Sequence, residues 1–152
     1  MLIGVISDTH GLLRPEAVAA LRGVEHILHA GDVGDVAILD ALREISPVTA
    51  IRGNVDVSGA CAELPATDVV ELGERLFYLV HSVRDLDINP MAAGVAMVVS
   101  GHSHKASVSV RNGVIYFNPG SAGPRRFKLP VTLGRLTVEG PSVRGEILQI
   151  VA

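Results

Sequence analysis

Seven polar residues at five places in the sequence are of the types that bind divalent metal ions. Each place follows a short apolar run, and core packing does not require Asp, His or Asn at so many equivalent positions. Carboxylates and imidazoles suit Mn, Fe, Zn and similar ions, and one carboxylate can bridge two ions. We expect two divalent ions, Mn foremost with Fe, Zn, Ni or Co as alternatives, held by Asp8, His10, Asp32, Asn54, His81, His102 and His104.

A pair of such ions has a defined chemistry with phosphate esters. Two ions about 3.5–4 Å apart hold the attacking and leaving oxygens of a displacement at phosphorus, and they lower the pKa of a bound water. A hydroxide held by the two ions is then available near neutral pH, and no covalent intermediate is needed. The same seven residues are therefore our candidates for catalysis as well as for metal binding.

The spacing of these residues fits one shared site. Asp8 and His10 are two positions apart, so both can project from one side of an extended turn, and His102 and His104 repeat this arrangement. Asn54 can ligate through its carbonyl oxygen without adding negative charge. A glycine stands directly before three of the candidates, and we expect its permissive backbone to allow sharp turns at Gly31, Gly53 and Gly101.

The first third of the chain alternates strand and helix patterns. Short apolar runs at 2–6, 26–29 and 48–51 predict buried strands. Between them, apolar residues at helical spacing predict helices over 15–21 and 35–45. This order predicts parallel strands with right-handed crossovers, whose functional groups lie at the carboxyl ends. The first three motifs all stand at such ends.

The rest of the chain is mostly strand-like. A hairpin around Gly73-Glu74 leads directly into His81, and a buried strand leads into His102. Helices among the early strands, followed by antiparallel strands, predict an α/β fold, a two-sheet β-sandwich flanked by helices, as one domain over residues 1–152. The expected later elements are strands at 69–72, 76–80, 95–99, 107–110, 114–117, 131–138 and 143–151, with a short helix at 90–93.

Composition disfavours several classes of protein. The 13 Lys plus Arg against 16 Asp plus Glu give a formal net charge of −3, without the basic excess that binding to nucleic acid usually needs. Cys61 is the only cysteine, so no intrachain disulfide forms. The N-terminal segment lacks the basic region of a signal peptide, and no apolar run has membrane-spanning length. We expect a cytoplasmic protein without a membrane partner.

In their order along the chain, the five motifs resemble those of the calcineurin-like metallophosphoesterases. The matching residues are Asp8-Thr9-His10, Gly31-Asp32, Gly53-Asn54, His81 and Gly101-His102-Ser103-His104. The small size and Asn118-Pro119-Gly120-Ser121 resemble the compact bacterial and archaeal phosphodiesterase branch, which has an α-β-β-α sandwich fold. The resemblance implies that one ion takes Asp8, His10 and His104, that the other takes Asn54, His81 and His102, and that Asp32 bridges them.

The sequence departs from the family pattern in three places. Larger members carry a His after the Asn of the third motif, thought to help protonate the leaving group, but Val55 stands here. The proton must then come from another group, or good leaving groups are preferred. The fourth motif commonly reads His-Gly-His, whereas this chain has His81-Ser82-Val83, and Ser103 replaces a usual Thr.

Other residues near the motifs have structural interpretations at least as good as functional ones. We expect His26 to be exposed. His29 and Asp56 would at most hold a metal ligand in place without contacting an ion. Cys61 fits a small packing residue. A phosphate-binding role is a minor alternative for Asn118-Pro119-Gly120-Ser121, which also fits a turn, and for the basic residues Arg125, Arg126 and Lys128, which also fit a solvated face.

The leading functional hypothesis is hydrolysis of a small phosphodiester, with phosphomonoesters as a second substrate class. The alternative is a catalytically weak or inactive scaffold for protein interactions, because the same fold includes a retromer subunit that lacks part of the ligand set. A nuclease ranks lower, since the chain has only five aromatic residues for base stacking. A homo-oligomer is left open.

Overall fold

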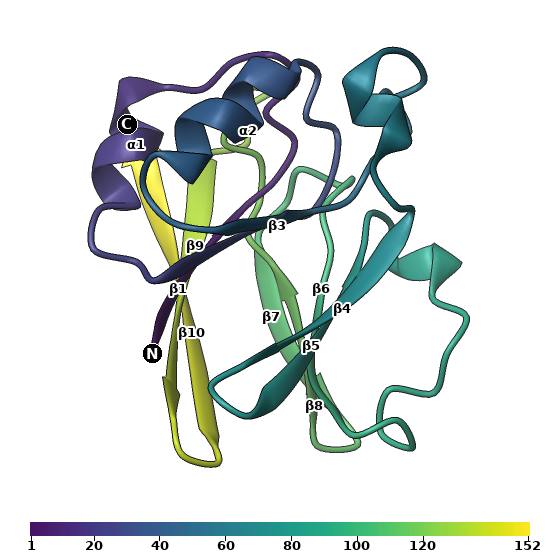
Figure 1. Ribbon diagram of the computed structural model, residues 1–152. Helices are drawn as coiled ribbons and strands as arrows, with labels where there is room; N and C mark the ends of the chain where they lie inside the picture. The colour runs from purple at the N-terminus through teal and green to yellow at the C-terminus, as the bar shows by residue number, and fades with distance from the viewer.

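The computed structural model describes all 152 residues and shows two β-sheets that pack against each other (Figure 1). Each sheet has five strands, in the orders β10-β9-β1-β2-β3 and β4-β5-β6-β8-β7. The elements are β1 (Leu2–Ile6), α1 (Pro15–Ala20), β2 (His26–His29), α2 (Val36–Arg43), β3 (Val48–Ala50), η1 (Ala60–Glu63), β4 (Thr67–Leu72), β5 (Arg75–Val80), η2 (Val83–Asp85), β6 (Val95–Val99), β7 (Ser107–Arg111), β8 (Val114–Asn118), β9 (Val131–Glu139) and β10 (Ser142–Val151).

The α/β two-sheet sandwich predicted from the sequence is confirmed, with its α-helices on the outer face of the first sheet only. The helix expected at 90–93 is absent. A single turn forms there, in which the Ala93 N–H donates to the Asn89 carbonyl, and Gly94 ends it with a φ of 76°. Leu86 and Ile88, from the loop after β5, pack instead with the outward-facing residues of the second sheet.

Alternate residues of β1 serve two different cores. Ile3 and Val5 lie in the cluster between the two sheets, whereas Ile6 lies in the cluster beneath the α-helices. This division follows from the two-residue period of a strand, which points successive side chains to opposite faces. β1 is therefore buried on both sides, which is why its sequence is an unbroken apolar run.

The two α-helices begin and pack as local sequence rules require. Asp35 accepts the backbone N–H of Ala37 and so caps the start of α2, and a stripe of Ile38, Leu39 and Leu42 buries one face of this helix. α1 begins with Pro15, whose missing N–H costs nothing in a first turn. None of the helices combines the length and the apolar character needed to cross a membrane.

The second sheet differs from the sequence-based expectation of antiparallel strands. β6 pairs in parallel with both β5 and β8, and only the edge strands β4 and β7 run antiparallel to their neighbours. The chain from 81 to 94 crosses over between β5 and β6, which a parallel pair requires. As a result, the carboxyl ends of β5 and β6 lie at one edge of the sheet, and the segments after them carry His81 and His102.

One aromatic ring joins the two sheets. Phe117 of β8 is 1% exposed and reaches across to Gly134 of β9 and Gly145 of β10. A Cβ atom added at either glycine would overlap the Phe117 ring, since the shortest contacts lie well below the normal approach of carbon atoms. The two glycines therefore make the space that this ring fills.

This packing predicts an energetic coupling between Gly134 and Phe117. We expect Gly134→Ala to lower the free energy of unfolding by about 1–3 kcal/mol, because the added methyl overpacks the core. In Phe117→Leu the smaller side chain leaves room for that methyl. The double variant should therefore lose at least about 0.5 kcal/mol less than the sum of the single changes, measured by denaturant unfolding. Strict additivity would contradict the packing described here.

Candidate metal centre

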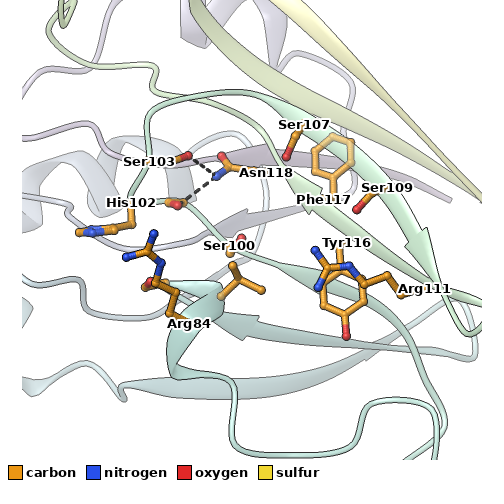
Figure 2. Close-up of a pocket in the computed structure, with 13 residues that line it drawn as sticks. Arg84, Ser100, His102, Ser103, Ser107, Ser109, Arg111, Tyr116, Phe117 and Asn118 are labelled. Carbon is orange, nitrogen blue, oxygen red and sulfur yellow. Dashed lines mark hydrogen bonds between the residues drawn. The ribbon is translucent and has the colours of Figure 1, made fainter.

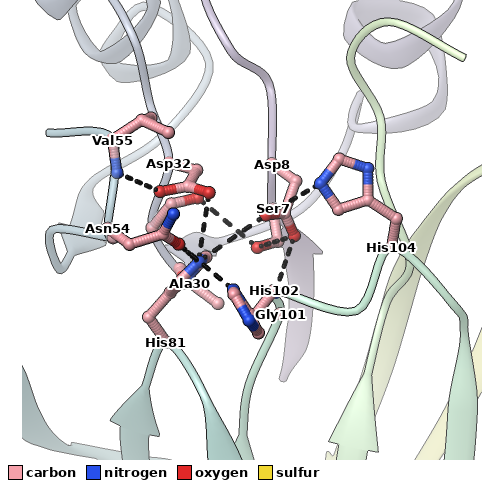
Figure 3. Close-up of polar contacts among 12 residues, drawn as sticks. Ser7, Asp8, Ala30, Asp32, Asn54, Val55, His81, Gly101, His102 and His104 are labelled. Atoms are coloured by element: carbon pink, nitrogen blue, oxygen red, sulfur yellow. Dashed lines mark hydrogen bonds and ion pairs between the residues drawn. The ribbon is translucent and has the colours of Figure 1, made fainter. Parts of the chain in front are cut away.

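The segments that follow β1, β2, β3, β5 and β6 meet and bring all seven candidate ligands together. Figure 3 labels all of these candidates except His10. Every one of the seven has a nitrogen or oxygen within 3.8 Å of another member of the set. Residues up to 96 positions apart in the chain thus share one polar cluster, from Asp8 to His104.

Asp32 lies between the two halves of this cluster. Its Oδ1 accepts the backbone N–H of Val55 at 3.0 Å, which fixes the orientation of the carboxylate. Its Oδ2 is left to face two imidazoles and lies 3.5 Å from His10 Nε2 and 3.2 Å from His81 Nε2. Asp32 therefore faces one imidazole from each half of the cluster.

The first half of the cluster contains Asp8, His10 and His104. Asp8 Oδ1 lies 3.5 Å from His104 Nε2 and 3.8 Å from His10 Nε2, and the two imidazole nitrogens are 3.2 Å apart. Asp8 and His104 are buried and His10 is partly exposed. These three ligand atoms lie close enough together to surround one ion.

The second half contains Asn54, His81 and His102. Asn54 Oδ1 lies 3.0 Å from His81 Nε2 and 3.1 Å from His102 Nδ1, and both Asn54 and His102 are exposed to solvent. Asp8 Oδ1 is as close to His81 Nε2, at 3.8 Å, as it is to His10. Asp8 can therefore contribute to either half, whereas the family resemblance assigned it to one.

Two side chains in the cluster, Asp8 and His81, fit a bound cation. Asp8 Oδ1 is buried without a hydrogen-bond donor. His81 Nδ1 lies 2.7 Å from the Ala30 carbonyl, which can only accept, so Nδ1 carries a proton. In the neutral form of His81 the Nε2 lone pair then faces the oxygens of Asp32 and Asn54. Electron pairs that face one another in this way are stabilised by a positive charge between them, so the donor set fits divalent metal ions.

Burial and the close approach of these side chains also shift the pKa values of Asp8, Asp32 and His104. Burial raises the pKa of Asp8, although the nearby His81 opposes the shift. Burial would also raise the pKa of Asp32, but hydrogen bonds from the protonated form of His81 and from the Val55 N–H lower the pKa of Asp32 to about 2. Burial, assisted by the charge of Arg126, lowers the pKa of His104 to about 4. At neutral pH His104 is thus a neutral imidazole, which is the form that binds metals.

The backbone of the cluster is strained. Five of the seven candidates have a positive φ, which L-residues adopt at a cost of about 1–2 kcal/mol each. Such strain persists only where the surrounding structure enforces it, and it concentrates at functional sites. The five residues are Asp8 (56°), His10 (45°), Asp32 (55°), His102 (70°) and His104 (62°).

The glycines that precede three of the candidates act in two different ways. Gly31 has a φ of 99°, as expected from its role in a sharp turn. Gly53 and Gly101 do not have a positive φ, so the expected reason is wrong for them. A Cβ at Gly53 would overlap Asp32, and one at Gly101 would overlap the Ser7 hydroxyl and lie 2.6 Å from Asp8 Oδ2. These two glycines are required by close approach.

Sequence reasoning missed the side chains that hold Asp8 and the His102 loop in place. The Ser7 hydroxyl donates to Asp8 Oδ2 at 2.8 Å, and the His102 backbone N–H donates to the same oxygen at 3.1 Å. Asn118 donates to the Gly101 carbonyl at 3.0 Å, so its role is to fix this loop. The adjacency of Ser7 to Asp8 was the only sequence signal for these contacts.

The secondary candidates have structural roles. The buried carboxylate of Asp56 accepts three backbone N–H groups at 2.9–3.1 Å, from Val33, Gly34 and Gly53, and thereby ties the loop after β2 to the loop after β3. His29 is buried, its pKa is lowered to about 4 by burial, and its Nε2 lies 3.0 Å from the Thr9 hydroxyl. His26 is not exposed as expected, because it is half-buried and its Nε2 lies 2.8 Å from the Thr49 hydroxyl.

The remaining candidates lie around the cluster. Cys61 is buried in the helix-covered core, in agreement with a packing role. Ser121 donates to the Asp8 carbonyl at 3.0 Å, so the 118–121 turn supports the first ligand loop. Arg125, Arg126 and Lys128 are exposed, and the first two line a cavity that also contacts His10 and His104.

Comparison with known proteins identifies the class to which this fold and cluster belong. Residues 1–140 match the calcineurin-like phosphoesterase superfamily domain. A probable metallophosphoesterase of Methanothermobacter thermautotrophicus is 34% identical over an alignment that covers 98% of this chain and 92% of that protein. The chain therefore belongs to the calcineurin-like phosphoesterases, a family of metal-dependent hydrolases of phosphate esters.

Solved structures share the fold at lower identity. An archaeal phosphodiesterase superposes with a TM-score of 0.78 at 24% identity, covering 97% of this chain and all of that chain. Vps29 of Chaetomium thermophilum superposes with a TM-score of 0.79 at 21% identity, covering 97% of this chain and 95% of that chain. These two likenesses establish the two-sheet architecture.

The role of Asp56 predicts a loss of metal affinity without loss of a ligand. We expect Asp56→Ala to lower the free energy of unfolding by about 1–3 kcal/mol and the affinity for Mn²⁺ by about 10–100-fold, because three N–H groups lose their acceptor and two ligand loops separate. Mn²⁺ titration and denaturant unfolding measure the two effects.

A matched control separates positioning from general destabilisation. Asp35→Ala also removes a carboxylate that accepts a backbone N–H, at the start of α2. It should cost about 1 kcal/mol of stability and leave Mn²⁺ affinity unchanged. Equal losses of affinity in the Asp35 and Asp56 variants would show that Asp56 does not position the ligand loops.

Proposed function

We propose that this protein is a metal-dependent phosphodiesterase, with phosphomonoesters as a second substrate class. The observation that carries the proposal is the position of Asp32, whose Oδ2 faces one imidazole from each half of the cluster. The family supports hydrolysis of a phosphate ester, and the structural likeness to an archaeal phosphodiesterase supports a diester. The substrate is a small molecule, since the chain carries no basic excess.

Each ligand has a proposed place in this reaction. Asp8, His10 and His104 would hold one ion, Asn54, His81 and His102 the other, with Asp32 between them. Such ions supply charge that stabilises the transition state and a nucleophile at neutral pH, and Mn is our first expectation for their identity. The protein fixes the donors beforehand through the Val55 N–H on Asp32 and the Ser7 hydroxyl on Asp8.

The leaving group is where this chain differs from larger family members. Val55 offers only a partly exposed apolar side chain, and its N–H is already bonded to Asp32. It cannot donate a proton to the departing oxygen. We therefore propose that esters with good leaving groups are the preferred substrates.

A protein-interaction scaffold is the second candidate, because Vps29 of Chaetomium thermophilum shares the fold. The presence of all seven candidate ligands favours an enzyme over a scaffold. Cytoplasmic location, a single domain over residues 1–152 and an open oligomeric state accompany the proposal as predictions.

The proposed function is tested by hydrolysis of a chromogenic diester and of the matching monoester by Mn-loaded protein. We expect kcat/KM for the diester to exceed that for the monoester. It should fall about 100-fold or more in Asp32→Asn and in His104→Ala, because each change removes a donor from the cluster. Metal content measured on the same samples shows whether the loss follows loss of ions.

The control is His26→Gln, which changes a half-buried histidine outside the cluster. It should retain the activity and metal content of the unchanged protein. Undiminished hydrolysis in both Asp32→Asn and His104→Ala would overturn the proposal. A metal-free, inactive protein would favour the scaffold.

A further inference from the structure

A cavity of about 230 Å³ opens beside His102, outside the ligand cluster (Figure 2). Its walls come from three places: the segment 82–84 after β5, the segment 100–103 after β6, and strands β7 and β8. At roughly 30 Å³ per water molecule, the volume suits a group of several non-hydrogen atoms, such as a phosphate on a short carbon arm. Because His102 lines it, the cavity borders the candidate metal centre.

The charge of this cavity is positive and uncompensated. Arg84 lies on the His102 side and Arg111 on the Tyr116 side (Figure 2), and no Asp or Glu lines the cavity. Neither arginine belongs to an ion pair. The Arg111 guanidinium lies 4.8 Å from the centre of the Tyr116 ring, so stacking holds it in place with its donors free.

The sequence of β7 places hydroxyl groups next to this charge. Ser107 and Ser109 alternate with Val108 and Val110, so the two serines share a face with Arg111 and all three line the cavity. Hydroxyls and guanidinium groups are donors that bind phosphate oxygens. One face of an otherwise exposed edge strand is thereby built as an anion-binding surface.

A second cavity, on the opposite side of His102, contains acidic residues. The cavity there is lined by Asn54, His81 and His102 together with Arg52, Asp85 and Asp87. Its two carboxylates outnumber its one guanidinium, so this side is less favourable to an anion than a wall with arginines and no acidic residue. Of the two sides of His102, the one with Arg84 and Arg111 therefore suits an anionic part of a substrate better.

We propose that the cavity between Arg84 and Arg111 binds a second phosphate group of the substrate. The inference rests on the proposed function and narrows it: the preferred substrate is a phosphodiester with a short arm that ends in a phosphate. Ser82 and Val83, which replace the Gly-His of the family's fourth motif, form part of this cavity wall. The altered motif thus changes substrate recognition and leaves the ligand His81 in place.

The kinetic test uses two aryl phosphodiesters with the same leaving group, one with an alkyl arm that ends in a phosphate and one with an arm that ends in a hydroxyl. We expect the Mn-loaded protein to show a KM at least about tenfold lower for the phosphate-bearing ester, and this difference to disappear in Arg84→Gln/Arg111→Gln. In the Arg84→Gln/Arg111→Gln variant, the KM for the hydroxyl-bearing ester should stay within about twofold of its value in the unchanged protein.

A binding measurement makes the result independent of turnover. Propylene bisphosphonate should bind the Mn-loaded protein at least about tenfold more tightly than propyl phosphonate, and the Arg84→Gln/Arg111→Gln variant should lose this difference. Arg43→Gln/Arg144→Gln removes the same charge from two distant exposed ion pairs and should retain the difference.

Failure of this inference and failure of the proposed function give different results. Absence of hydrolysis of both esters overturns the phosphodiesterase, while the bisphosphonate titration still reports on the cavity. The inference is overturned if the protein does not distinguish the matched ligands, or if Arg84→Gln/Arg111→Gln still does. It is also overturned if Arg125→Gln/Arg126→Gln, on the His10 side, abolishes the difference instead.

Discussion

The structure depends on two buried carboxylates that share one cluster. Asp8 and Asp32 are 0% and 2% exposed, and each raises the cost of ionising the other. Buried charges persist only when they are paired or bound to metal. Here the partners are imidazoles, of which His104 has a lowered pKa and His81 a raised one. The cluster thus combines strong negative charge with incomplete compensation, which is the electrostatic character of a site built for cations.

The rest of the fold supplies the rigidity that this cluster needs. Its ligand loops carry five residues with positive φ, and strained loops keep their shape only on a firm frame. The frame is the pair of sheets, closed on one side by the α-helices and joined through Phe117 between Gly134 and Gly145. Asp56 then links the loops after β2 and β3 directly.

Much of the fold and of the candidate site could be predicted from the sequence. Buried apolar runs such as Leu2–Ile6 and Val95–Val99 are strands at the expected positions, because burial on both faces leaves a local signature. The seven candidates could be found because strand ends are equivalent places in an α/β fold. The fold brings these seven residues together, and their role as metal ligands stays a prediction.

What the sequence could not reveal depends on partners distant in the chain. The parallel pairing of β6 with β8 follows from which strands meet in space, and β7 alone would suggest only a hairpin. The need for Gly53 and Gly101 comes from side chains 21 and 94 positions away, at Asp32 and Ser7, so backbone preference gave the wrong reason. Likewise, Asn118 has the sequence of a turn residue until Gly101 is seen beside it.

We propose that Asp32 lies between two metal ions. Anomalous diffraction from crystals of the Mn-loaded protein tests it most directly. Two anomalous peaks about 3.5–4 Å apart, one on the His10 side of Asp32 and one on the His81 side, are the result that this account requires. A single peak, or peaks that do not include Asp32 among their ligands, would contradict it.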